Sequence, residues 1–126
     1  NLEVQFYFDW NNYQDSVNVL TDVIFDPYKS YYHLPIDAYT TCFINMYFDL
    51  CEIQRRELQK KFNQLNKKNV TAYFECFYAF QTSAEKERQR FLLDLDRGTN
   101  ERNLLKWNRY IYEQLNINNV QIFLGN

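Results

Sequence analysis

Glycine and proline are scarce in this sequence of 126 residues, which contains only two of each. Phosphate-binding loops and many tight turns need glycine, so two glycines leave few positions at which this chain could form them. The sequence also contains no match to GxGxxG, GxxxxGK[ST], HExxH or GxSxG, which mark nucleotide-binding loops, metalloproteases and serine hydrolases. We therefore expect long elements with short connections and no enzyme of these classes.

Residue types that carry catalysis or bind metals are also few. His33 is the only histidine, and no nucleophile stands near it in the sequence. Cys42, Cys51 and Cys76 have neither CxxC spacing nor neighbouring histidines, so they do not form a zinc motif. We predict no catalytic residue, no cofactor and no metal site, and we interpret the thiols as reduced and buried.

The sequence has no hydrophobic run of the roughly 18 residues that a membrane span requires, and no signal-peptide pattern. These absences and the odd number of cysteines favour the cytoplasm of a bacterial or infected host cell, without a membrane partner. Because the chain starts at Asn1 and not at Met, a processed form or a segment of a longer protein is a second interpretation. The glycosylation sequon at 69–71 is the one feature that favours secretion.

Aromatic residues are abundant and make up 19% of the chain. Frequent Asn, Tyr, Phe and Ile beside scarce Ala, Gly and Pro are typical of an AT-rich bacterium, phage or virus. A chain of this length buries about two thirds of its unfolded surface in one core. We therefore predict a single compact domain over residues 1–126.

A strand is predicted at each end of the chain. Apolar residues occupy every second position of segment 2–10, which places them on one face of a strand. Val120, Ile122 and Leu124 alternate in the same way. We expect the N- and C-terminal segments to pair as a minor two-stranded sheet, whose open edge can receive a partner strand or a second copy.

Helical spacing dominates the rest, so the predicted class is mainly α (α+β) with four to five helices. The segments with this spacing are 36–65, 70–80, 84–95 and 100–115. Thr82 and Glu85 match a capping box, which predicts a new helix from Ala84. Thr99 or Asn100 is expected to cap the last helix.

Segment 17–24 fits two interpretations. Val17, Leu20 and Ile24 follow helical spacing, which favours a short amphipathic helix. Val19 and Thr21 belong to an alternating β-branched series, which favours a strand. The pattern does not decide between the two.

One shared core is predicted from the apolar positions of the helices. Its members are Phe43, Tyr47, Leu50, Phe74, Phe77, Phe91, Leu95 and Trp107.

Charge is distributed unevenly along the chain. Residues 1–50 carry seven acidic and one basic residue, whereas residues 51–126 carry nine acidic and thirteen basic residues. Six cations cluster in segment 55–68: Arg55, Arg56, Lys60, Lys61, Lys67 and Lys68. Such a cluster can bind nucleic acid or an acidic protein, but the net charge of −2 and the pI near 5.4 do not fit a dedicated nucleic-acid binder.

The expected function is that of a non-enzymatic protein-binding module, such as a small inhibitor, immunity or accessory factor. The partner-binding candidates are the six cations of 55–68 together with Tyr7, Tyr31 and Tyr32, since tyrosine suits protein interfaces. A second copy of the chain is a further partner. The alternatives are a nucleic-acid-associated protein that uses 55–68 and a small helical enzyme.

Overall fold

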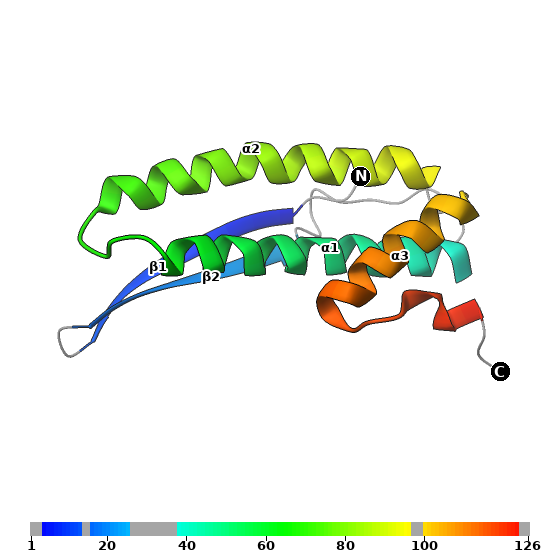
Figure 1. Cartoon of the computed structure of the whole chain (residues 1–126), viewed down its shortest axis with the longest axis horizontal. Helices are drawn as coiled ribbons and strands as arrows, with labels where there is room; N and C mark the ends of the chain where they lie inside the picture. Colours follow the sequence, from blue (N-terminus) through cyan, green and yellow to red (C-terminus); the bar gives the residue numbers. More distant parts are fainter. Residues whose placement is uncertain (1–3, 14–15, 26–37, 97–99, 124–126) are drawn as a thin grey trace. The chain divides into compact units, whose positions relative to one another are not determined.

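The computed structural model describes residues 4–13, 16–25, 38–96 and 100–123 (Figure 1). The elements are β1 (Val4–Tyr13), β2 (Ser16–Phe25), α1 (Ala38–Asn63), α2 (Val70–Leu95), α3 (Glu101–Leu115) and the 3-10 helix η2 (Asn119–Phe123). The predicted mainly helical class with a minor two-stranded sheet is confirmed. The prediction of four to five helices is wrong, because three α-helices account for the described part of the chain.

The chain divides into two compact units. Residues 1–32 and 54–85 form one, called here the hairpin unit, and residues 33–53 and 86–126 form the other, called the α3 unit. Both long helices therefore contribute one part to each unit. The assignment of 1–126 to a single domain stays a prediction.

The sheet is a local hairpin, so the predicted pairing of the two chain ends is wrong. β1 pairs antiparallel with β2 over ten positions, from Val4 opposite Phe25 to Tyr13 opposite Ser16. Segment 17–24 is thus a strand, and its β-branched series describes it better than its helical spacing. Strands that are adjacent in sequence close a short loop, whereas pairing the two ends would close a loop of nearly the whole chain.

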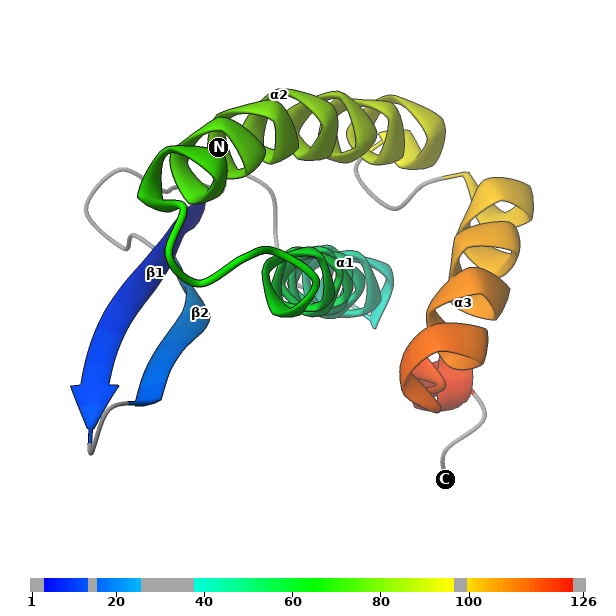
Figure 2. The same cartoon turned by 60° about the vertical axis from the view of Figure 1, so that its left-hand side comes forward.

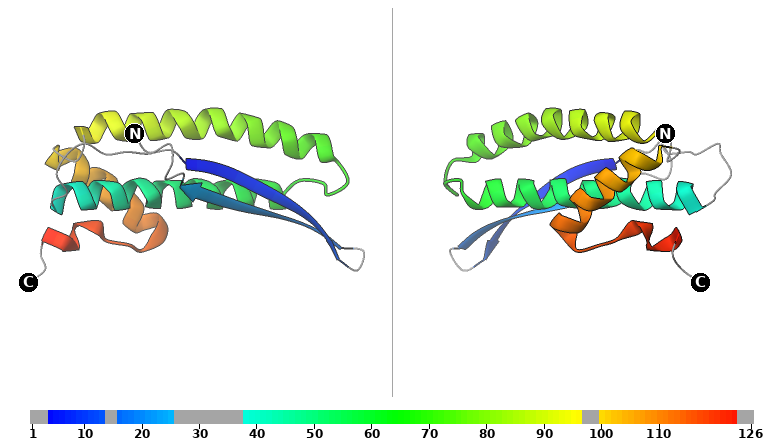
Figure 3. Two further views of the ribbon diagram at one scale, coloured as in Figure 1. Left: turned by 180° about the vertical axis from the view of Figure 1, so that it is seen from behind. Right: turned by 45° about the vertical axis from the view of Figure 1, so that its right-hand side comes forward.

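The C-terminal tail forms η2 because asparagine side chains hold its backbone. Asn118 accepts a hydrogen bond from the Val120 backbone at 3.2 Å, and Asn108 accepts one from the Asn119 backbone at 2.9 Å. The Asn119 side chain donates to Asp49 at 2.7 Å. These local bonds compete with an extended strand, so alternating apolar residues alone did not decide the conformation. Figure 3 shows η2 in red after α3.

A single helix, α2, replaces the two helices predicted over 70–80 and 84–95. Thr82 does not cap a new helix, because its hydroxyl donates to the Tyr78 carbonyl one turn earlier, at 3.4 Å. This bond is available to a threonine inside a continuous helix. No glycine or proline interrupts residues 70–95, so nothing ends the helix there.

The core of the α3 unit contains most of the predicted core residues. The Phe91 ring stacks on Phe43 at 5.6 Å and meets Trp107 edge-on at 5.2 Å, and Leu50 and Leu95 are fully buried. Phe74 and Phe77 belong to the hairpin unit instead. Phe74 is 46% exposed, so its assignment to a buried core is wrong.

The boundaries of α3 agree with the predicted capping. Asn100 accepts a hydrogen bond from the Asn103 backbone at 3.1 Å, which confirms Asn100 as the cap. The helix ends at Asn116, which adopts a left-handed conformation with φ of 59°. Asparagine tolerates this region better than most residues, so the sequence supplies a stop signal without glycine. Thr99 lies outside the described residues.

Candidate functional site

The hairpin attaches to its unit through an aromatic inner face. Phe8 of β1 lies 5.1 Å from Phe62 of α1 and 5.0 Å from Phe77 of α2, and Phe6 meets Phe80 edge-on at 5.1 Å. Alternation along the strand directs both of these β1 side chains to the same face. The aromatic contacts fix which face of the sheet is buried and which face is presented outward.

A side chain from α1 closes the outer edge of β2. The Gln59 amide accepts a hydrogen bond from the Thr21 backbone at 2.8 Å and donates one to the Val19 carbonyl at 2.7 Å. These are the two groups that a neighbouring strand would bond, so Gln59 takes the place of a strand. Arg55 adds a hydrogen bond to the Thr21 hydroxyl at 3.2 Å. In Figure 2, β2 runs between β1 and α1.

The outer edge of β1 carries the same kind of backbone groups, and no described strand pairs with it. Because Val19 and Thr21 direct their backbone groups toward Gln59, their partners Trp10 and Phe8 direct theirs away from β2. Within the described part of the chain the sheet contains only β1 and β2. The edge of β1 is therefore a template for an added strand.

The outward face of the hairpin is apolar and acidic. Tyr7 is 45% exposed, Leu20 58% and Ile24 50%. Asp9 and Asp22 are exposed on the same face, opposite Leu20 and Tyr7 in the register. Neither strand contains lysine or arginine. This face therefore has negative charge around exposed apolar side chains, a combination that attracts cationic partners.

The predicted basic site at 55–68 is only partly available. Arg55 is bonded to the hairpin, so its guanidinium has a structural role. Arg56, Lys60 and Lys61 are exposed on α1, and the lysines of the following turn, at 67 and 68, are exposed as well. Whether these cations bind nucleic acid or protein stays a prediction.

The three predicted tyrosines separate into two groups. Tyr7 is exposed on the hairpin, where its hydroxyl donates to the Gln5 side chain. Tyr31 and Tyr32 lie outside the described residues, as does His33, on which the alternative of a helical enzyme depends.

Sequence reasoning missed the outward residues of β2. The helical interpretation of 17–24 placed Leu20 and Ile24 on a buried face, but the structure exposes both. The signal was present in the alternation of that segment, since β-branched residues at odd positions leave Leu20, Asp22 and Ile24 together on the other face. Gln59 carried no signal of its own, because its role depends on a strand 40 residues away.

The three cysteines lie in different environments. Burial raises the pKa of the Cys42 thiol to about 11, which keeps it protonated and weakly nucleophilic near neutral pH. Cys42 and Cys51 are buried, as predicted, whereas Cys76 is half-buried. Across the described ranges, no three His, Cys, Asp or Glu side chains gather as a metal site.

The helices that the structure describes include none long and apolar enough to cross a membrane.

The candidate site on the hairpin unit has three parts. They are the closed edge of β2, the open edge of β1 and the rings that contact Phe6 and Phe8, called here the aromatic seat: Phe62, Phe74, Phe77 and Phe80. No known protein family matches the chain, and neither a curated protein nor a solved structure matches it.

Proposed function

We propose that this chain is a non-enzymatic protein-binding module that captures an extended segment of another protein on the open edge of β1. The observation that carries the proposal is the asymmetry of the two sheet edges. Gln59 occupies the edge of β2, whereas the outer backbone groups of β1 face no third strand in the described chain. Strand addition provides backbone hydrogen bonds to any extended partner, and side chains then select among partners.

The partner that best complements this face is a strand whose lysine or arginine side chains lie on the outward face of the extended sheet. A strand added beside β1 places its outward side chains next to Tyr7 and Asp9, with Asp22 one strand further. Since the hairpin has no cation of its own, a basic strand gains attraction and an acidic strand is repelled. The module is compatible with an inhibitor, immunity or accessory role in an AT-rich bacterium, phage or virus.

The test uses two peptides of about ten residues, matched to the length of β1. One alternates lysine with valine, and the other alternates glutamate with valine. Amide hydrogen exchange of the whole chain is measured with each. We expect the lysine peptide to slow exchange at Phe8 and Trp10, whose N–H groups face the open edge, and the glutamate peptide to have no effect. No slowing with either peptide contradicts strand addition.

Two matched variants locate the binding edge. Asp9→Lys and Asp22→Lys make the same change on the same face of the sheet, but Asp9 lies on the open-edge strand and Asp22 on the closed-edge strand. We expect Asp9→Lys to weaken binding of the lysine peptide roughly tenfold and Asp22→Lys to weaken it much less, because charge repulsion falls with distance. Equal losses would place the peptide across the face and not along the edge.

A further inference from the structure

The α3 unit presents a basic cleft of about 750 Å³ that sequence analysis did not identify. It is called here the α3 cleft. The described residues that line it are Asn100, Arg102, Asn103, Leu105, Lys106 and Arg109. All six belong to the cap and first turns of α3, and all except Asn103 are exposed, so the described part of the cleft is shallow and open to solvent.

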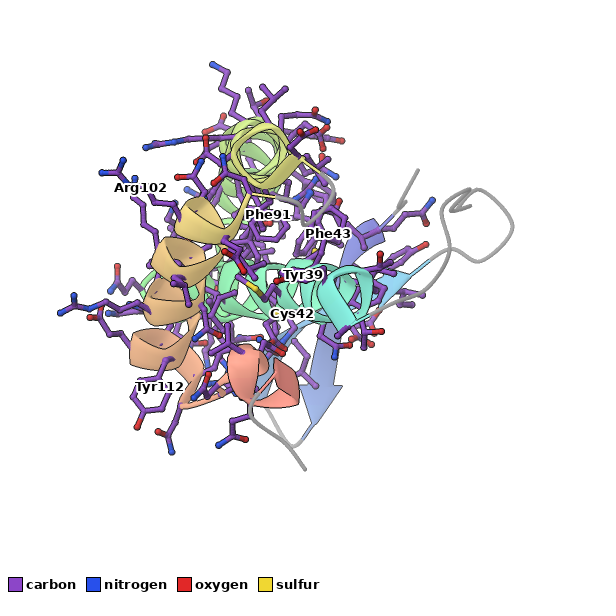
Figure 4. The ribbon with its side chains drawn as sticks, turned by 90° about the vertical axis from the view of Figure 1, so that its right-hand side faces the viewer. Tyr39, Cys42, Phe43, Phe91, Arg102 and Tyr112 are labelled. Atoms are coloured by element: carbon purple, nitrogen blue, oxygen red, sulfur yellow. The ribbon has the colours of Figure 1, made fainter. Side chains whose placement is uncertain are left out.

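Three cations share this side of α3. Arg102, Lys106 and Arg109 are spaced by four and three residues, which places them within roughly one sixth of the helix circumference. At 1.5 Å per residue they follow the helix axis for about 10 Å. The opposite side of α3 is anchored by Leu104 and Ile111, which are buried, so the helix orientation is fixed. Figure 4 shows Arg102 and Tyr112 pointing away from Phe43 and Phe91.

Acidic side chains nearby do not neutralise this row. Among the described residues, the side chains of Arg102 and Lys106 form no hydrogen bond or ion pair. Arg109 meets Glu113 at 3.4 Å, but both side chains are largely exposed, so the pair is weak. Glu101 is the acid of the first turn, and its carboxylate accepts a hydrogen bond from the Tyr39 hydroxyl at 2.7 Å.

The chemistry of the lining favours phosphate over carboxylate. Guanidinium groups bind phosphate oxygens through two parallel hydrogen bonds, and lysine adds a point charge. A carboxylate carries a single charge, so several residues of an acidic peptide are needed to match three cations over this length. Linked phosphates carry their charges on adjacent groups and fit one short cleft. Leu105, which is 58% exposed, offers an apolar surface beside the cations.

We propose that the α3 cleft binds a polyphosphate group, held by Arg102, Lys106 and Arg109. A nucleoside triphosphate and a free inorganic polyphosphate share this chemistry. They differ in the base, for which Leu105 is the apolar contact among the described lining residues. The inference is independent of strand capture, because α3 and β1 belong to different units.

The test is calorimetric titration of the whole chain with inorganic triphosphate, and separately with ATP, at low and at high salt. We expect binding that weakens as salt rises, because the contacts are ionic. Tighter binding of ATP than of triphosphate identifies a nucleotide site, and equal binding identifies a polyphosphate site. No heat of binding at millimolar triphosphate in low salt, or tighter binding of a poly-glutamate peptide, overturns the proposal.

Two double variants with the same loss of charge locate the site. R102Q/K106Q removes two cations of the cleft, and K60Q/K61Q removes two exposed lysines of the hairpin unit. We expect R102Q/K106Q to lower the affinity for triphosphate by tenfold or more and K60Q/K61Q to lower it by less than about twofold. The reverse order would move anion binding to segment 55–68 and overturn the proposal. K106Q alone, with an expected loss of several-fold, covers the case in which the double variant does not fold.

Discussion

At the scale of single residues, partly buried polar side chains decide the local geometry of this protein. Asp49 and Asn119 join α1 to η2, and Asn108 with Asn118 fixes the backbone between α3 and η2. Gln59 acts in the same way in the hairpin unit. Such amide side chains both donate and accept, so one residue can satisfy two partly buried groups, as Gln59 does for the backbone of β2. Their roles depend on partners that are distant in sequence.

Asp49 gives a prediction for the pH dependence of stability. Burial raises the pKa of its carboxyl, and the hydrogen bond from Asn119 opposes the rise. The folded chain therefore holds the Asp49 proton more tightly than the unfolded chain, and stability falls as pH rises above about 4, the ordinary pKa. Asp49→Asn keeps an oxygen that accepts from Asn119 but has no charge, so we expect its stability relative to the native chain to increase from pH 3 to pH 7.

Chemical denaturation at several pH values measures this difference. Asn119→Ala is the matched second variant, because it removes the bond that opposes the rise in the Asp49 pKa. Its loss of stability should be larger at pH 7 than at pH 3. A difference between Asp49→Asn and the native chain that does not change with pH would contradict the assignment.

At the scale of elements, the aromatic seat under β1 explains why a two-stranded hairpin is stable here. An isolated hairpin is marginal in water and needs another layer to cover one face. Phe6 and Phe8 supply that face, and rings from α1 and α2 receive them. Helix residues therefore supply the covering layer that a two-stranded hairpin needs, and they hold the element that presents the open edge.

Two phenylalanines that both contact Phe8 make a controlled test of this seat. Phe62 is 1% exposed and Phe74 is 46% exposed, at ring distances of 5.1 and 5.5 Å from Phe8. We expect Phe62→Ala to lower the free energy of unfolding by about 3–5 kcal/mol, because it leaves a cavity. Phe74→Ala should cost about 1 kcal/mol, because solvent already reaches that ring. Denaturant titration measures both, and equal costs would contradict the burial of the seat.

At the scale of the whole molecule, acidic and basic surfaces are separated between elements and not between units, because Arg56, Lys60 and Lys61 are exposed on the same unit as the acidic hairpin strands. The hairpin strands have acids and no cations, whereas α3 has the row of Arg102, Lys106 and Arg109. A net charge of −2 conceals this separation, since the opposite charges nearly cancel in the sum. Salt is therefore expected to weaken the proposed strand capture and the proposed phosphate binding alike, through different surfaces.

The reaction rates of the three thiols measure whether the whole chain is folded. Cys42 and Cys51 are buried, and a Cys42 pKa of about 11 leaves less than about 1% thiolate at pH 8. With a thiol reagent at pH 8, we expect rapid reaction at the half-buried Cys76 and slow reaction at the other two. All three should react at once in denaturant. Rapid reaction at Cys42 in the native chain would contradict its burial.

The sequence by itself determined the helical class, the long α1, a cap of α3 at residue 99 or 100, and a strand at the start of the chain. These features depend on local signals, namely the 3.6-residue and two-residue periods and the chemistry of a helix end. The same signals were wrong at 120–123 and at Thr82, and Leu124 lies outside the described residues. In both places, a hydrogen bond between a side chain and a backbone group two or four residues away competes with the apolar pattern, and periodicity does not measure that competition.

Only the tertiary structure decided the pairing of β1 with β2 and the difference between the two sheet edges. Segment 17–24 satisfied both periods, so the choice between helix and strand depended on whether Phe6 and Phe8 had a partner strand and an aromatic seat. Gln59 closes one edge from a position 40 residues away from Val19. The α3 cleft likewise exists because burial of Leu104 and Ile111 turns the three cations outward together. Long-range packing sets which side of an element is left for function, and no local pattern contains that information.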